Sequence, residues 1–552
     1  MPAEPGGPVP DLPASPTLPA LVADLAAATP DAPALVAGAP GAATEWTYRE
    51  LDDAARRAAT ALAALGAGPD APVALLAGNS AEWLAATLGA MRTGARVDAV
   101  NTWVKAWDLR HLLATCGAPV LVMDAAVRSS DLLGALRELL PQLWDADPGG
   151  WSSTEFPALR EVVVIDRDPG TDVPRGARRW STITDVAPSD TCAAGPDDTA
   201  FVLYTSGSTR HPKAVPLLQR DTIVNGFHIG ERMGLGAADR VWLGSPLFWS
   251  FGAANALPAT FSHGACLVAQ DQFEPAATVA MLAEQRCTAA YLLPSLADAL
   301  AGVAEQVRAV TTLRTGLSIG RPDELHRIVD VLDIPEICNI YGSTETYGNC
   351  CVTPHDAPLE LRLTTQGPAL PGNELRVVDD SGATLPVGEF GELQVRGRVM
   401  HGYLGDDAET ADNNAKALTP DGWYRTGDRL RIRDDGFVEF GARLTDMIKT
   451  NGINVAPAEV EGFLSTHPAV AEVAVVGAPH PARGEVVMAF ATLVPGSAVT
   501  GADLREHCRA SIAGYKVPWE VVVVEALPRT TTGKLTRLTL AEDAAERVRR
   551  AG

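Results

Sequence analysis

A short polar stretch near the middle of the chain follows an apolar, β-prone run at residues 199–204. It supplies four hydroxyls, a glycine and a lysine, which are Thr205, Ser206, Gly207, Ser208, Thr209 and Lys213. A strand that leads into a turn with hydroxyls, free backbone N–H groups and an ammonium can bind phosphate. The sequence therefore predicts a phosphate-binding loop, although a hydroxyl-rich surface loop has a similar composition.

Two other motifs do not fit this loop. A P-loop has glycine directly before its lysine and Ser or Thr after it, whereas Pro212 and Ala214 flank Lys213. A nucleophile elbow needs a serine with glycine two residues away on both sides, which no serine here has.

Composition limits the class of protein. A chain of 552 residues with 46% apolar and 20% charged residues is typical of a globular protein with several domains or subdomains. The net charge of −23 argues against nucleic acid or an anionic membrane as the main partner. Anionic substrates must then meet local basic residues.

Residues 1–20 are rich in Pro, Ala and Gly, which predicts a disordered leader rather than a signal peptide. No apolar run reaches membrane-spanning length. The eight cysteines include no C-x-x-C pair, which predicts reduced, mostly buried thiols in a cytoplasmic protein, and Cys and His show no metal-ligand spacing.

Apolar runs alternate with helical patterns over most of the chain. In residues 21–190, helical patterns at 48–65 and 81–92 alternate with apolar runs at 73–76, 120–123 and 162–165. In residues 191–366, expected strands at 239–243, 266–269, 289–293 and 315–319 alternate with expected helices at 255–263, 275–286 and 296–306. This rhythm predicts two α/β layered subdomains with parallel strands.

The pattern changes after residue 366. Short alternating strands at 374–378, 391–397 and 429–440 predict a small β-barrel-like subdomain over 367–443. Residues 444–552 mix strands at 472–476, 486–493 and 520–524 with helices at 457–466 and 501–513. The predicted fold is α/β: an N-terminal domain of three subdomains at 21–443, followed by a small α+β domain.

Five separated motifs occur in a characteristic order. They are the loop at 204–213, Tyr341-Gly342-Ser343-Thr344-Glu345, Tyr424-Arg425-Thr426-Gly427-Asp428, the stretch 443–461 that begins at Arg443, and the stretch 528–534 that ends at Lys534. This order resembles the adenylate-forming superfamily of acyl-CoA ligases, peptide-synthetase adenylation domains and luciferases. The resemblance covers the chain from about residue 21 to its end and is greatest to stand-alone acyl- or aryl-CoA ligases.

The resemblance implies ATP, Mg²⁺ and CoA as cofactors or substrates. It implies that Lys534, Thr344 and Glu345 are catalytic, with Glu345 holding Mg²⁺. The implied nucleotide-binding residues are Thr205, Ser206, Gly207, Ser208, Thr209, Lys213, Gly320, Tyr341, Gly342, Asp428 and Arg443. Each of three residues also has an ordinary alternative when it is considered without the other motifs. Asp428 could be a turn residue, Lys534 a solvated lysine, and Glu345 an acid favoured at a helix N-terminus.

The family's small domain turns between an adenylating pose and a pose that admits the acceptor thiol. Thr445 and Asp446 stand at the matching hinge positions, and Gly452 stands where a pantetheine arm passes close to the backbone. A simple turn glycine beside Asn451 is the alternative for Gly452.

The chain departs from the family pattern at several positions. Arg210 and Ala214 replace loop glycines, and Ala442 replaces the glycine before Arg443. Trp249 stands where many acyl-CoA ligases have His and amino-acid-activating domains have Asp. An indole offers a flat wall for an aromatic or apolar acid but no charge, so a free amino acid is disfavoured as substrate.

The predicted acid pocket consists of Asn225, His228, Trp249, Phe251, Ser318, Tyr347 and Asn349, with Gly320 beside it. Each of these residues could instead belong to the core. The predicted reaction is ATP-dependent activation of an aromatic or apolar carboxylic acid as acyl-adenylate, followed by transfer to CoA. Two alternatives stay open: a different acceptor, such as a carrier protein, an amine or another nitrogen nucleophile, and a nucleotide-binding relative without catalysis. Oligomeric state is not indicated.

Overall fold

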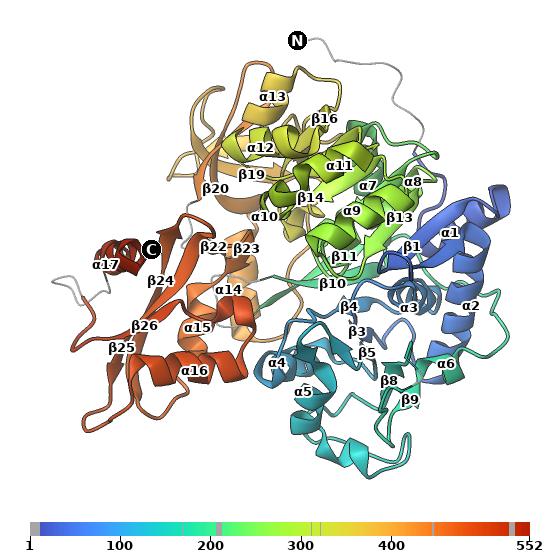
Figure 1. The fold of residues 1–552 in the computed structure, drawn as a ribbon, viewed down its shortest axis with the longest axis horizontal. Helices are drawn as coiled ribbons and strands as arrows, with labels where there is room; N and C mark the ends of the chain where they lie inside the picture. The colour runs from blue at the N-terminus through green and yellow to red at the C-terminus, as the bar shows by residue number, and fades with distance from the viewer. Residues whose placement is uncertain are drawn as a thin grey trace. The chain divides into compact units, whose positions relative to one another are not determined.

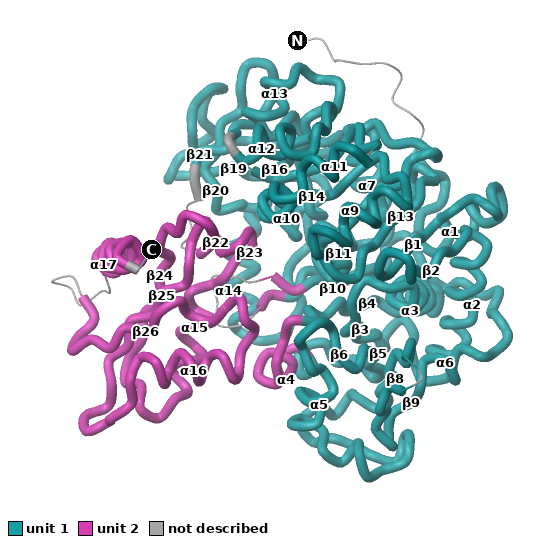
Figure 2. Tube along the Cα trace, in the orientation of Figure 1, with its two compact units in different colours: residues 1–102, 113–203, 214–442 teal, residues 103–112, 204–213, 443–552 magenta. Residues whose placement is uncertain are grey.

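The structure is a computed structural model that describes residues 12–168, 170–205, 212–310, 312–320, 322–443, 447–528 and 536–551. The chain divides into two compact units (Figure 2). Unit 1 comprises residues 1–102, 113–203 and 214–442, and unit 2 comprises residues 103–112, 204–213 and 443–552.

The first sheet has the order β11-β10-β4-β3-β5-β8-β9 (Figure 1). Its strands are β3 (Val73–Leu76), β4 (Val97–Ala99), β5 (Val120–Asp124), β8 (Glu161–Ile165), β9 (Arg178–Arg179), β10 (Thr199–Thr205) and β11 (Lys213–Leu218). Strands β3, β4, β5 and β8 pair in parallel, as their continuous apolar runs predict. Helices α2 (Tyr48–Ala64) and α3 (Ala81–Arg92) pack together beside it, and Trp83 of α3 stacks on Phe201 of β10.

The second sheet has the order β17-β16-β15-β14-β12-β13-β1-β2. Its strands are β1 (Pro33–Gly38), β2 (Thr44–Thr47), β12 (Arg240–Leu243), β13 (Cys266–Gln270), β14 (Ala289–Leu292), β15 (Thr315–Ser318), β16 (Glu336–Tyr341) and β17 (Cys351–Val352). Neighbouring strands from β16 to β1 are parallel, so their carboxyl ends lie at one edge. Helices α9 (Pro275–Glu284), α10 (Pro294–Leu300), α11 (Ala304–Val310) and α12 (Pro322–Leu332) bury one face in a shared core. Helix α7 (Gln219–Met233) contacts β15 and β16, and helix α8 (Leu257–Ser262) contacts β13.

The two sheets exchange strands across the expected boundary at residue 190. Strand β1 pairs with β13 in the second sheet, whereas β10 pairs with β4 in the first. Helix α1 (Leu18–Ala28) begins inside the predicted leader, and Leu18 is fully buried. Local sequence patterns do not specify such long-range pairing, because the residues of β1 and β10 are compatible with a strand in either sheet.

Two expected helices are interrupted. The helix predicted over 255–263 is a wide turn with π-helical geometry, η2 (Ser250–Ala256), followed by α8. The helix predicted over 296–306 is split into α10, the 3₁₀ turn η3 (Ala301–Val303) and α11. Gly302 lies in the 3₁₀ turn, and glycine weakens a helix interior.

The strands expected over 367–443 form a sheet in the linear order β18-β19-β20-β21. They are β18 (Glu374–Val378), β19 (Gly391–Arg396), β20 (Tyr424–Ile432) and β21 (Val438–Arg443), with α14 (Ala408–Ala417) between β19 and β20. Within the described residues β18 does not pair with β21, so the barrel-like closure expected from the sequence is replaced by an open sheet.

The remaining elements of unit 1 are short connections. They are β6 (Ala126–Val127), β7 (Ser130–Asp131), α5 (Leu132–Leu139), η1 (Pro141–Trp144), α6 (Trp180–Ile183), η4 (Thr344–Thr346) and α13 (Leu359–Thr364).

Unit 2 contains a sheet of the order β23-β22-β25-β24, with β26 parallel to β25. Its elements are β22 (Ile448–Thr450), β23 (Ile453–Val455), α15 (Pro457–Leu464), β24 (Val470–His480), β25 (Gly484–Leu493), α16 (Gly501–Ser511), η5 (Gly514–Lys516), β26 (Glu520–Val523) and α17 (Arg537–Ala551). Residues 103–112, which include the start of α4 (Ala106–Cys116), belong to the same unit. There the buried Lys516 ammonium pairs with Asp108 at 2.7 Å and with Glu459 at 3.4 Å.

Two glycines with positive φ give a matched test of backbone packing in unit 1. At Gly367 (φ +78°) an added Cβ would lie 2.2 Å from the backbone of residues 352 and 353, whereas at Gly422 (φ +83°) it would meet nothing within 4 Å. We expect Gly422→Ala to lower the free energy of unfolding by about 1 kcal/mol, from backbone strain alone. Gly367→Ala should lower it by about 3 kcal/mol or more, because overpacking adds to the strain. Equal losses in chemical denaturation would contradict the packing described.

Candidate functional site

A hydrogen bond joins Tyr341, the last residue of β16, to Asp428 of β20. The Tyr341 hydroxyl donates to Asp428 Oδ2 over 2.8 Å, and both side chains are buried. Burial and the adjacent Asp428 carboxylate raise the pKa of Tyr341 well above its usual value, so the phenol keeps its proton. This bond brings the second and third sequence motifs together.

Glu345 lies in η4, four residues after Tyr341, and is also buried. Its Oε1 accepts a hydrogen bond from the Tyr403 hydroxyl at 2.9 Å, and its carbonyl accepts one from the Met400 amide. Burial and the Glu345 charge raise the pKa of Tyr403, so this phenol also remains a donor. Sequence reasoning missed Tyr403, because nothing in its spacing links it to Glu345.

Gly342 lets the following loop pass close to the Tyr341 motif. A Cβ on Gly342 would lie 2.4 Å from the carbonyl oxygen of Gly348 and 2.5 Å from Cα of Asn349. Any side chain at this position would push residues 348 and 349 away. Packing against residues 348 and 349 therefore requires a glycine at position 342, whether or not a nucleotide binds there.

Helix α7 holds this loop in place. The Asn225 side-chain amide donates to the carbonyls of Tyr347 at 3.1 Å and Asn349 at 3.0 Å. The Tyr347 hydroxyl accepts from the Leu218 amide at 3.2 Å, while its backbone adopts φ +56°. In this structure Asn225 and Tyr347 fix the loop backbone, whereas the Asn349 side chain makes no hydrogen bond to any described residue.

His228 lies one turn beyond Asn225 on α7 and is 7% exposed. Burial, together with the positive charges of Arg398 and Arg232, lowers its pKa to about 4. The imidazole is therefore neutral at pH 7. It offers a hydrogen-bonding group but no charge for a carboxylate.

Aromatic residues at the start of η2 supply apolar surface. Trp249 precedes the turn and meets Phe248 edge to face, and Phe251 meets Tyr291 of β14 in the same way, with ring centroids 5.1 Å apart. Ser318 ends β15, and Gly320 follows at a point where a Cβ would lie 3.2 Å from the Glu324 carboxylate. These residues all belong to unit 1.

Several predicted site residues belong to unit 2 or are not described. Thr205 ends β10, Lys213 begins β11 and Arg443 ends β21. Gly452 (φ +80°) and Asn451 (φ +49°) form the two-residue turn between β22 and β23, where both central residues need positive φ. The turn alone accounts for a glycine at position 452, whether or not an acceptor arm passes near it. The predictions for Ser206, Gly207, Ser208, Thr209, Arg210, Thr445, Asp446 and Lys534 lie outside the described residues.

No group of three or more His, Cys, Asp or Glu side chains suited to a metal occurs within the described ranges. Glu345 nevertheless fits Mg²⁺, because this ion is commonly held by one or two carboxylates together with substrate phosphates and water. In the same part of the chain, no helix has the length and hydrophobicity needed to cross a membrane.

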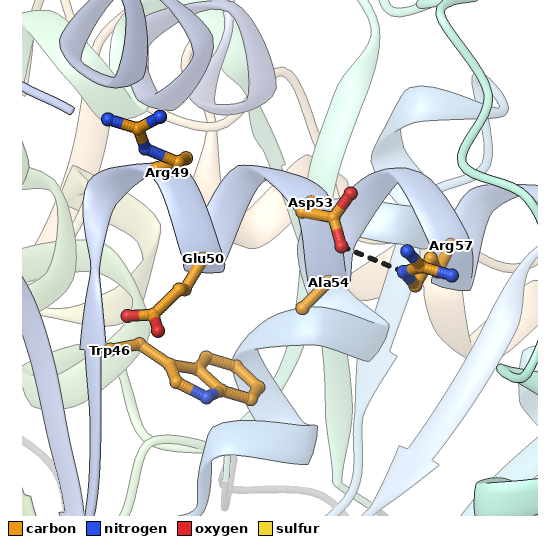
Figure 3. A pocket seen from close by; sticks show the side chains of 6 residues that line it. All are labelled: Trp46, Arg49, Glu50, Asp53, Ala54 and Arg57. Carbon is orange, nitrogen blue, oxygen red and sulfur yellow. Dashed lines mark hydrogen bonds and ion pairs between the residues drawn. The ribbon is translucent and has the colours of Figure 1, made fainter.

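A hollow of about 440 Å³ lies elsewhere on unit 1, along α2 (Figure 3). It is lined by Trp46, Arg49, Glu50, Asp53, Ala54 and Arg57. Asp53 pairs with Arg57 at 2.7 Å, and the Glu50 carboxylate accepts hydrogen bonds from Thr47. Because Asp53 and Arg57 are paired with each other and the hollow contains no predicted site residue, we do not assign the proposed reaction to it.

The neutral state of His228 predicts a pH dependence of stability. Its pKa of about 4 in the folded chain lies below the ordinary value of 6.5, so the unfolded chain binds the proton first as pH falls. Stability from this site is complete above pH 6.5 and declines toward pH 4, by about 2 kcal/mol at pH 5. We expect His228→Gln to lose about 2 kcal/mol less than the wild type between pH 7 and pH 5 in chemical denaturation. An equal loss in both proteins would contradict a buried neutral imidazole.

Known families and structures resemble the chain over most of its length. The model of the family described as AMP-binding enzyme matches residues 22–404, and that of the AMP-binding enzyme C-terminal domain matches residues 459–534. The indoleacetate–CoA ligase of Aromatoleum aromaticum is 32% identical over 89% of this chain and 92% of its own. The acyl-CoA ligase SID4 of Ajellomyces capsulatus is 30% identical, with 91% and 87% covered.

Among solved structures, the amide bond synthetase McbA from Marinactinospora thermotolerans superposes with a TM-score of 0.78 at 25% identity. The match covers 95% of this chain and 99% of that protein. The family match covers more than half of the chain and includes the motifs at 204–213 and 341–345. The chain belongs to the AMP-binding enzyme family and is an adenylate-forming ligase.

Proposed function

We propose that this ligase activates an organic acid with an apolar body as its acyl-adenylate, releasing pyrophosphate, and then transfers the acyl group to the thiol of CoA. The observation that carries the proposal is the pair of buried, tyrosine-bonded carboxylates, Asp428 and Glu345, on adjoining motifs. Each carboxylate is held as an acceptor in a fixed place. Such preorganisation suits a nucleotide, which brings hydroxyls at the ribose and a metal ion at the phosphates.

The chemistry needs positive charge, because it brings the anionic acid and the anionic α-phosphate together. In the proposal, Asp428 accepts hydrogen bonds from the ribose hydroxyls, and Lys213 and Arg443 contact phosphate or ribose. Lys534 stabilises charge on the oxygens around the α-phosphate, which is worth on the order of 3 kcal/mol for one well-placed donor. The backbone N–H groups and hydroxyls of residues 205–209 bind the remaining phosphates, and Gly320 and Gly342 allow close approach of the nucleotide.

Glu345, with Thr344 before it, is the proposed ligand for Mg²⁺. When bound, the ion would neutralise phosphate charge. The role of the chain is to hold Glu345 Oε1 by the Tyr403 hydroxyl, so that the carboxylate does not turn away. Tyr403 is thus a positioning residue rather than a catalytic one.

The nature of the acid is inferred from the neutral surroundings of its proposed pocket. Trp249 and Phe251 give aromatic surface, and His228 carries no charge at pH 7. The relatives that act on indoleacetate and on medium-chain acids, by their names, support an acid with an apolar body. A free amino acid lacks a partner for its ammonium there.

An amine acceptor in place of CoA is the second candidate. It is favoured by the likeness to an amide bond synthetase over 95% of the chain. We keep CoA as the first choice, because the related sequences that cover most of the chain are named as CoA ligases.

We further propose that residues 444–552 form a mobile domain that turns at Thr445 and Asp446 and opens a path past Gly452 for the thiol. A reducing, cytoplasmic location is supported by the eight cysteines, none of which is disulfide-bonded.

The reaction is tested by ATP–pyrophosphate exchange over a panel of acids, followed by addition of CoA or an amine. We expect exchange with at least one aromatic or medium-chain acid and acyl-CoA as the product. Amide formation without thioester would replace CoA by the second candidate. Absence of exchange with every acid would refute the proposal.

Lys534→Ala tests the proposed mechanism, with Lys416→Ala as control because Lys416 is an exposed lysine of α14 paired with Asp412. We expect Lys534→Ala to reduce the exchange rate by two to three orders of magnitude without lowering the melting temperature. Lys416→Ala should leave the rate unchanged. Normal exchange by the Lys534 variant would rule out its catalytic role.

A further inference from the structure

Asn349 is fully buried, and neither atom of its carboxamide has a hydrogen-bond partner among the described residues. It is the one described side chain for which two buried polar atoms are unpaired. Buried amides in native structures are nearly always paired, because leaving both atoms unpaired is unfavourable. Single unpaired atoms also occur far from the proposed pocket, as at Thr87, so it is the doubly unpaired amide of a predicted pocket residue that points to a partner supplied by a ligand.

Two further unpaired groups lie on η2, which packs against Gly348 beside Asn349, and on β14, which η2 contacts through Phe251. The hydroxyl of Tyr291 on β14 and the Oδ1 of Asn255 on η2 are buried and lack partners within the described part of the chain. The carboxamide of Asn255 lies against Gly348, where an added Cβ would come within 2.2 Å of its Nδ2. Tyr291 contacts Phe251, four residues before Asn255 on η2.

We propose that the acid carries a neutral hydrogen-bonding substituent on its apolar body, such as a hydroxyl or amino group, which the Asn349 carboxamide binds with the help of Tyr291 and Asn255. This inference rests on the proposed function and refines its substrate class. The unpaired atoms include both donors and acceptors and carry no charge. They suit a neutral substituent and not a second carboxylate.

The backbone that carries Asn349 is held independently of any ligand. Asn225 donates to the carbonyls of Tyr347 and Asn349, and Gly342 allows close packing beneath them. The Asn349 side chain is thus presented from a fixed position, which a recognition group requires. Asn255 is held similarly, since its Nδ2 donates to the Ser250 carbonyl at 3.2 Å and only Oδ1 remains unpaired.

A site of this kind discriminates strongly against an acid that lacks the substituent. The plain acid would fill the same space but leave the buried amide unpaired, whereas the substituted acid would satisfy it. Sites that hydrogen-bond a substrate hydroxyl reject the analogue without it far better than apolar pockets distinguish one methylene. Asn349, Tyr291 and Asn255 are then specificity-determining residues of this chain.

The test uses pairs of acids that differ by one substituent. Suitable pairs are 4-hydroxyphenylacetate with phenylacetate, 5-hydroxyindoleacetate with indoleacetate, 2-aminobenzoate with benzoate, and 8-hydroxyoctanoate with octanoate. In the full-length wild type we expect kcat/KM for ATP–pyrophosphate exchange to be at least tenfold higher for the substituted acid of at least one pair. Asn349→Leu should reduce that preference at least tenfold, by slowing the substituted acid much more than the plain acid.

Tyr291→Phe and Thr87→Val form a matched comparison, because each removes one buried, unpaired hydroxyl. Thr87 lies on α3, outside the proposed pocket. Neither variant should lower the melting temperature of the ligand-free protein. Tyr291→Phe should weaken the preference for the substituted acid and the stabilisation that this acid gives, whereas Thr87→Val should leave both unchanged.

The outcomes separate this inference from the proposed function. Exchange with plain and substituted acids at equal rates, or a preference unaffected by Asn349→Leu, would overturn the inference and leave the proposed function intact. That result would mean that ordered water satisfies the amide. Absence of exchange with every acid would overturn both.

Discussion

The hydrogen bond from Tyr341 to Asp428 joins residues 87 positions apart and links the second sheet of unit 1 to its open four-stranded sheet. A buried carboxylate is tolerated only when donors satisfy it, so the strands must stay in the register that brings the phenol to the acid. Tyr403 does the same for Glu345 from a different loop. The two acceptors proposed to bind nucleotide and metal are therefore fixed by the fold before any ligand arrives.

The loop at 347–349 connects this nucleotide region to the proposed acid pocket. It begins three residues after Thr344 and packs closely against Gly342. Hydrogen bonds from Asn225 connect it to α7. Tyr347 has a positive φ, its carbonyl accepts a hydrogen bond from Asn225, and its hydroxyl accepts one from the Leu218 amide. One short segment thus receives its shape from the nucleotide motif on one side and from α7 on the other.

Much of this organisation could be predicted from the sequence, and the exceptions have physical causes. Strands such as β3 and helices such as α3 were predictable because their apolar runs and periodicity are local. The pairing of β1 with β13 was not, because register between distant strands leaves no local pattern. At the candidate site, Tyr341, Glu345 and Asp428 were predicted from ordered motifs, whereas Tyr403 and Tyr291 have no such signal. Asn255 could have been noticed as the lone polar residue in the apolar run at 253–257.

We propose that the tyrosine-bonded carboxylates preorganise this chain for ATP. Calorimetric binding of MgATP to Tyr341→Phe, compared with the wild type, tests it most directly, since the substitution removes one hydroxyl and leaves the ring. Loss of the donor leaves the buried Asp428 without one of its partners, at a cost of about 1 to 3 kcal/mol. The predicted result is MgATP binding about 5- to 150-fold weaker in a variant that remains folded. Binding of unchanged affinity would contradict the account.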